Sequence, residues 1–203
     1  MKTIVVVILL ASLVLEGGCS PAQEYVRAGF DFARIDRVAV VGVHGDIENP
    51  TVANQIAEYF AAELREKGYV PLGLSDARKQ LASQRFSQDE FARPGGAVRA
   101  GLILDVPAVL TVEVPNAGEQ MSISAKLINV ETGGVLWMGS ATGRPRMTIK
   151  ERITELRYRI KGQQPPEPPA PPEGAMPARK ARQARELISR VCRGLPPRPR
   201  QRR

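Results

Sequence analysis

Alternating apolar and polar residues over positions 121–127 predict a half-buried β-strand. A β-branched, mostly apolar run at 108–114 precedes it, and a third short apolar run follows a Glu-Thr-Gly-Gly turn. Three strands joined by two short turns predict an antiparallel meander over residues 107–143. Leu127 and Ile128 are adjacent apolar residues, so we expect either a β-bulge there or cover on both faces of the strand.

Upstream of the meander the pattern predicts five elements. They are a strand at 37–43, a helix at 50–67, a strand at 69–72, a helix from Ser75 onward and a helix at 97–105. The first strand is continuously apolar, which is typical of a central strand buried on both faces. Asn49 and Pro50 supply an N-cap and a favourable first helical residue, and Pro71 favours an edge position for the second strand. This order predicts an α/β fold, a three-layer sandwich with a mixed sheet whose first strands are parallel and whose C-terminal strands form the antiparallel meander.

The composition changes at residue 144. Apolar residues spaced by four, three and four predict an amphipathic helix over about 148–161, with arginines among its exposed positions. Residues 165–172 are proline-rich and predict an extended spacer, and residues 178–193 again show a helical apolar stripe. The predicted organisation is a signal peptide (1–18), an anchor and tether (19–36), an α/β core domain (37–143), a basic helix with a proline-rich insertion (144–177), a C-terminal helix (178–194) and a disordered basic tail (195–203).

The first residues indicate export. Lys2 precedes an apolar run at 4–15 that is too short to span a bilayer stably. The sequence Gly-Gly-Cys-Ser then resembles a lipobox, which predicts that Cys19 becomes an N-palmitoyl, S-diacylglycerol cysteine holding the chain to a membrane. Glu16 stands where a lipobox usually has leucine, so ordinary cleavage after Ala22 is the alternative. Ser20, in place of aspartate, favours the outer membrane, with the domain facing the periplasm.

The hairpin LINVETGGVLWMG at 127–139 resembles the last hairpin of a group of bacterial envelope lipoproteins. That group includes the curli secretion-channel protein, the outer-membrane lipoprotein activator of penicillin-binding proteins, and the amino-terminal domain of TolB. RVAVVGV at 37–43 and LILDVPAVLTVEV at 102–114 follow the group's order. The resemblance implies a non-enzymatic, protein-binding adaptor or activator with an unknown envelope protein as its partner.

A secretion-channel component is the alternative within that group. A channel needs added hairpins with strands of about 9 to 11 residues. The turns at 116–119 and 131–134 are tight, so we favour the adaptor.

Candidate chemistry is sparse. His44 is the only histidine, which excludes a histidine-rich metal site, and neither a phosphate-binding glycine loop nor a nucleophile elbow is present. His44, Asp46 and Glu48 lie at the carboxyl end of the first strand, where α/β sheets bind ligands. A periplasmic small-molecule binder that uses this edge is the rival hypothesis. We expect no cofactor and no metal.

Charge divides the chain. Residues 19–143 hold 11 Lys and Arg against 15 Asp and Glu, whereas residues 144–203 hold 17 against 5. The basic tail is either solvated sequence or a contact for anionic lipid or peptidoglycan, and we expect no nucleic acid partner. If Cys19 carries lipid, Cys192 is the only remaining thiol, and a core position on the last helix is favoured over a bridge between two copies.

Overall fold

The computed structural model describes residues 23–86, 90, 95–118, 120–145, 149–162 and 174–199. Within these ranges every helix is too short or too polar to cross a membrane. The elements follow in the order β1 (Gln23–Val26), η2 (Phe32–Arg34), β2 (Arg37–Gly45), α2 (Pro50–Glu66), β3 (Val70–Leu72), α3 (Leu74–Ser83), α4 (Gly96–Ile103), β4 (Ala108–Asn116), β5 (Met121–Asn129), β6 (Val135–Gly143), α5 (Ile149–Ile160), α6 (Ala178–Val191) and η4 (Cys192–Gly194).

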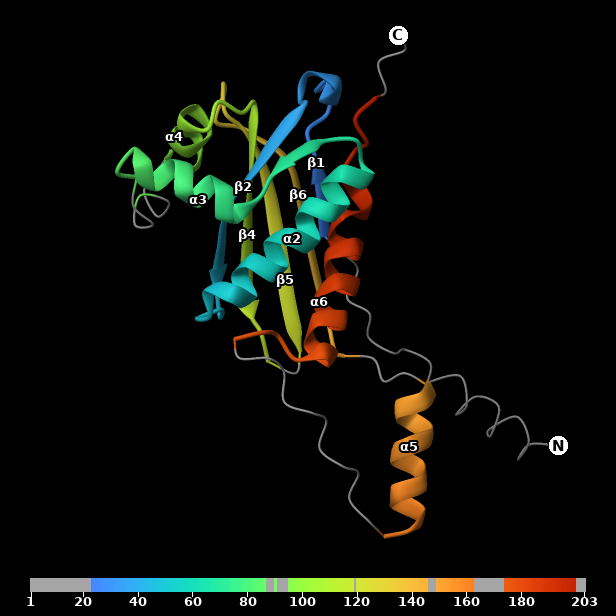
Figure 1. Ribbon diagram of the computed structural model, residues 1–203. Helices are drawn as coiled ribbons and strands as arrows, with labels where there is room; N and C mark the ends of the chain where they lie inside the picture. Colours follow the sequence, from blue (N-terminus) through green and yellow to red (C-terminus); the bar gives the residue numbers. More distant parts are fainter. Residues whose placement is uncertain are drawn as a thin grey trace, which may run out of the picture.

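One mixed sheet organises the molecule, in the strand order β1-β6-β5-β4-β2-β3. β2 pairs in parallel with β3 and β4, whereas β4, β5, β6 and β1 pair antiparallel. Helices α2 and α6 cover one side of the sheet, and α3 and α4 pack on the other side (Figure 1). The predicted α/β fold, with a mixed sheet between two helical layers, is therefore confirmed, as is the meander.

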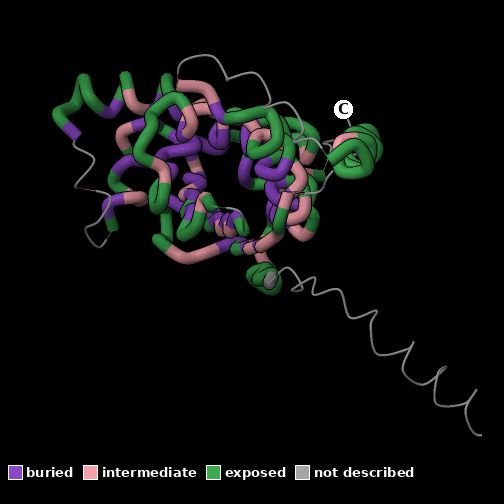
Figure 2. Tube along the Cα trace, turned by 90° about the horizontal axis from the view of Figure 1, so that it is seen from below, coloured by how far each residue is buried: buried purple, intermediate pink, exposed green. Residues whose placement is uncertain are grey.

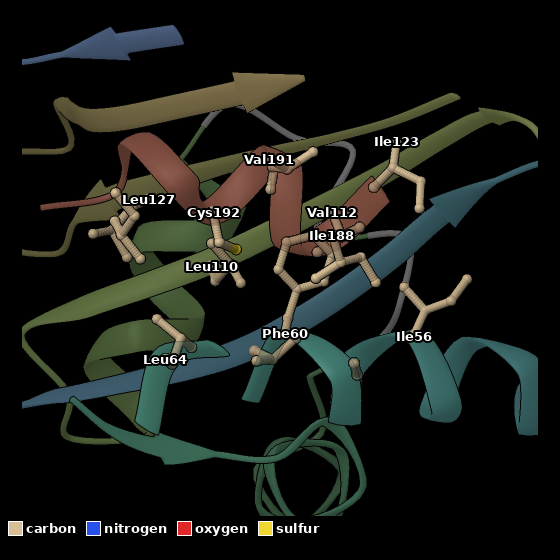
Figure 3. Close-up of a cluster of buried hydrophobic side chains, with 14 of the residues drawn as sticks. Ile56, Phe60, Leu64, Leu110, Val112, Ile123, Leu127, Ile188, Val191 and Cys192 are labelled. Carbon is tan, nitrogen blue, oxygen red and sulfur yellow. The ribbon is translucent and has the colours of Figure 1, made fainter. Parts of the chain in front are cut away.

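The larger core lies between the sheet and the pair α2 and α6. Buried positions gather between the sheet and its helices (Figure 2). Cys192 is among them, as expected for a core residue. Burial raises the pKa of its thiol, and the nearby Glu63 carboxylate adds to this shift. Figure 3 shows side chains from α2, β4, β5 and the last helix meeting in this core: Ile56, Phe60, Leu64, Leu110, Val112, Ile123, Leu127, Ile188, Val191 and Cys192.

A smaller core lies under α3 and α4, where Ala77, Leu81 and Ala100 pack on Ala39 and Val109 of the sheet. Helix α4 lies close to the strands at Gly101. A Cβ atom there would come within 2.9 Å of the Val109 side chain and would clash with Val130 as well. Glycine at this position therefore permits the close approach of α4 to the sheet.

The irregularity expected near Leu127 is present. The register of β5 with β6 shifts between Leu127 and Ile128, and Leu136 is the extra residue on β6. Leu127 packs in the larger core and Ile128 against the smaller one, so β5 is also covered on both sides at this point. Asn129 fixes the following turn, because its Oδ1 accepts hydrogen bonds from the Thr132 amide at 2.7 Å and the Thr132 hydroxyl at 3.1 Å.

Three local features differ from the sequence-based expectations. Residues 23–26, expected as part of a tether, form β1 on the edge of the sheet. Helix α3 begins at Leu74, after Gly73 and without a side-chain cap, rather than at Ser75. The expectation of disorder from residue 195 is wrong for residues 195–199, because Leu195 is buried and the Arg198 amide donates to the Lys67 carbonyl at 2.8 Å. Residues 200–203 lie outside the described ranges.

Tyr69 holds this C-terminal segment in place. Its hydroxyl donates to the Pro196 carbonyl at 2.7 Å, and burial raises its pKa to about 12 against the opposing charge of Arg198. Because the folded pKa exceeds the unfolded value of about 10, the neutral phenol stabilises the fold below pH 10, and this contribution is lost as the pH rises from 10 to 12. The loss amounts to roughly 2–3 kcal/mol.

We expect Tyr69→Phe to lower the free energy of unfolding by about 1 kcal/mol at neutral pH, because the Pro196 carbonyl loses its donor. The difference from the wild type should shrink as the pH rises above 10 and then reverse in sign before pH 12, because the wild type loses more than about 1 kcal/mol over this range and the variant has no phenol to ionise. Urea unfolding followed by circular dichroism from neutral to alkaline pH measures both curves. Parallel curves across pH 10 to 12 would show that the phenol of Tyr69 is not protected in the folded state.

Candidate functional site

One side of the sheet is only half covered by helices. Helices α3 and α4 pack mainly on β2 and β4, and α4 reaches the end of β5 (Figure 1). Side chains of β2, β4, β5, β6 and β1 that point to this side beyond the two helices form a surface that we call the open face. Its members are Tyr25, His44, Thr111, Glu113, Ser122, Ser124, Lys126, Met138, Ser140 and Thr142.

The register of the strands arranges these residues in rows. In the first row Tyr25 pairs with Met138, Met138 with Lys126, and Lys126 with Thr111. Tyr25 is 46% exposed and Met138 is 38% exposed. A tyrosine and a methionine side by side in solvent are the residue types that protein interfaces favour.

The second row is polar and ends on the only histidine. Ser140 pairs with Ser124, Ser124 with Glu113, and Glu113 with His44. Beyond it, the hydroxyls of Ser122 and Thr142 lie 3.0 Å apart and share a hydrogen bond. The open face thus combines a small apolar pair at the β1–β6 edge with hydroxyl and charged neighbours.

A shallow pocket of about 160 Å³ opens at one end of this face, lined chiefly by His44, Thr111, Glu113, Ser124 and Lys126. The His44 ring packs closely on Gly42. A Cβ atom at position 42 would collide with that ring, so glycine permits this packing. Partial burial and the positive charge of Arg78 lower the pKa of His44, and the Glu113 carboxylate opposes this shift.

The structure does not assemble the predicted edge of His44, Asp46 and Glu48 into one site. His44 lines the pocket. The Asp46 carboxylate accepts a hydrogen bond from the Ala117 amide at 3.0 Å and so holds the β4–β5 turn, while Glu48 is exposed in the loop before α2. No cluster of three or more His, Cys, Asp or Glu suited to a metal occurs among the described residues. Cys19 lies outside them.

Tyr25, Met138, Thr111 and Glu113 are members of the open face that the sequence does not identify. The alternation over 121–127 marked Ser122, Ser124 and Lys126 as the side of β5 away from the larger core. Which strands flank that side depends on pairings between distant segments, and these pairings leave no local signal in the sequence.

No family model matches the chain, and a search of curated proteins also gives no match. Among solved structures, the PelC dodecamer from Paraburkholderia phytofirmans is 16% identical, with a TM-score of 0.47, over 89% of this chain and 98% of that one. Lipoprotein GNA1162 from Neisseria meningitidis is 19% identical, with a TM-score of 0.48, over 62% and 94%. The LpoB C-terminal domain from Salmonella enterica is 17% identical, with a TM-score of 0.44, over 58% and 87%. The identities are below 25% and the TM-scores below 0.5, so these likenesses carry no conclusion about the function of this chain.

Proposed function

We propose that this chain is a non-enzymatic envelope protein, anchored by lipid on Cys19 to the outer membrane and facing the periplasm, that binds a partner protein through the open face. The half-uncovered sheet with its row of Tyr25, Met138, Lys126 and Thr111 is the observation that carries the proposal. It is a contact surface rather than an enclosed cleft.

The composition of the open face supports protein binding. The uncovered strands pair antiparallel, and an antiparallel sheet can present one face to solvent, so the open face is accessible to another molecule. Tyr25 and Met138, on the edge strand β1 and its neighbour β6, gain from burial, and Lys126 and Glu113, on β5 and β4, give charge complementarity. The ten side chains of the open face would form part of an interface of ordinary size, in which each partner contributes about 20–30 residues.

The rival hypothesis of a small-molecule binder has less support. The pocket at His44 measures about 160 Å³, whereas sites for small molecules usually enclose about 300–1,000 Å³. Asp46 is engaged in holding a turn and lies outside the pocket lining. His44 and Glu113 therefore serve better as polar members of a larger interface.

Replacing Tyr25 and Met138 together with serine tests this function. We expect the lipidated double variant to recover on the order of tenfold less partner from envelope extracts than the wild type does, because a few buried aromatic and apolar contacts dominate interface affinity. Quantitative affinity capture with mass spectrometry measures the recovery. Leu102→Ser is the matched control, since Leu102 is 66% exposed on α4 and is not a member of the open face.

Both variants replace exposed side chains, so their unfolding midpoints should stay close to that of the wild type. Equal loss of the partner in Leu102→Ser, or full recovery with the double variant, would show that the open face does not bind the partner.

A further inference from the structure

Helix α5 carries an apolar surface that the rest of the fold leaves exposed. The twelve-residue helix has no buried residue, and it stands apart from the body of the molecule (Figure 1). Its four large apolar side chains are between 48% and 78% exposed. We call this set the α5 stripe: Ile149, Ile153, Leu156 and Ile160.

The charges of α5 are arranged around this stripe. At about 100° per residue, the four members of the stripe fall within about 60° of one another. Lys150 and Arg157 flank the stripe on one side, and Arg152 and Arg159 flank it on the other. Both acidic residues, at positions 151 and 155, fall on the far side of the helix. A helix with this arrangement can lie in a membrane surface. Its apolar stripe then inserts among the acyl chains, its flanking lysines and arginines reach the lipid phosphates, and its acidic residues face the water.

An ion pair between α5 and the body indicates the direction of the stripe. Glu151 accepts a hydrogen bond from the Arg182 guanidinium of α6 at 2.9 Å. Because Glu151 lies on the side of α5 opposite the stripe, this contact turns the polar side toward the body and the stripe away from it.

The position of α5 agrees with the proposed anchor. Gln23, the first residue of β1, pairs with Ser140, three residues before the end of β6 at Gly143. α5 begins six residues after Gly143. Cys19 precedes Gln23 by four residues, a stretch that spans at most about 14 Å. The lipid-bearing end of the chain and α5 therefore leave the same end of the sheet.

We propose that α5 lies in the surface of an anionic phospholipid membrane with the α5 stripe inserted, as a second membrane contact beside the lipid. The inference rests on the proposed function in one respect only, that the lipid anchor on Cys19 and α5 would face the same membrane. Protein without lipid therefore tests it separately.

The probe is a set of vesicles containing equal parts of phosphatidylglycerol and phosphatidylethanolamine, mixed with the mature chain carrying Cys19→Ser. We expect this protein to sediment with these vesicles and much less with phosphatidylcholine vesicles. Ile153→Glu with Leu156→Glu should lower the bound fraction on the order of tenfold, because it places charges within the stripe. Arg152→Gln with Arg159→Gln should also weaken binding, and Leu102→Glu should leave it unchanged.

Unfolding midpoints near that of the parent protein would establish that these surface variants remain folded. Sedimentation that the stripe variant does not change, or that Leu102→Glu lowers equally, would overturn the proposal. A concentration-dependent dimer that the stripe variant abolishes, without any binding to vesicles, would assign the stripe to a second copy of the chain and would also overturn it. Lack of lipid on Cys19 in cells would refute the anchor alone.

Discussion

Cells that express the wild-type chain with labelled palmitate should incorporate the label, and cells that express Cys19→Ser should incorporate none. An acyl chain gains about 0.8 kcal/mol for each buried CH₂ group, so the chains of a triacylated cysteine hold a protein stably to a bilayer. Cys19→Ser removes the residue that would carry these chains, so this variant should lose its lipid attachment completely. Cys192→Ser is the matched control, because it removes the only other thiol, which is buried in the core.

Mass spectrometry of the mature amino terminus distinguishes the two processing routes. An acylated start at Cys19 agrees with the anchor, while an unacylated start at position 23 would establish ordinary cleavage after Ala22. Label that persists in Cys19→Ser but disappears in Cys192→Ser would also contradict the anchor.

Trp137→Ala should destabilise the fold by about 3–5 kcal/mol, a large part of the total stability of a domain of this size. Trp137 is fully buried in the larger core, and its ring fills space beside Gly139, where a Cβ atom would come within 2.8 Å of the Val191 carbonyl. The surrounding strands and α6 cannot close the cavity without moving the backbone. Urea unfolding followed by circular dichroism measures the change.

Two controls separate this effect from a general weakness of β6. Met138→Ala alters the next residue, which points to the opposite side of the sheet and is partly exposed, so it should cost less than about 1 kcal/mol. Trp137→Phe should fall between the two alanine variants, because the phenyl ring fills much of the space and the indole Nε1 has no hydrogen-bond partner among the described residues. Similar unfolding midpoints for Trp137→Ala and Met138→Ala would contradict the core assignment.

Local pattern was sufficient for much of the fold. Strict alternation at 121–127 predicted β5, and the cap and proline at Asn49 and Pro50 predicted the start of α2. β1 was missed because its four residues are too few to show periodicity, and its pairing with β6 spans more than a hundred positions. Docking of residues 195–199 was missed because prolines and arginines surround the single buried Leu195.

The functional surface was harder to predict than the fold. The sequence grouped His44 with Asp46 and Glu48 because they are close along the chain, whereas the sheet register groups His44 with Glu113 and Ser124. Exposure of Tyr25 and Met138 depends on how far α3 and α4 extend over the sheet. That extent follows from the packing of the smaller core, which no local pattern encodes.

The most direct test of contact through the open face is photo-crosslinking in living cells, with p-benzoylphenylalanine placed at Met138 and, separately, at Leu102. We expect the probe at Met138 to crosslink to one predominant envelope protein and the probe at Leu102 to leave that protein unlinked. No crosslinked protein at Met138, or the same products at both positions, would contradict it.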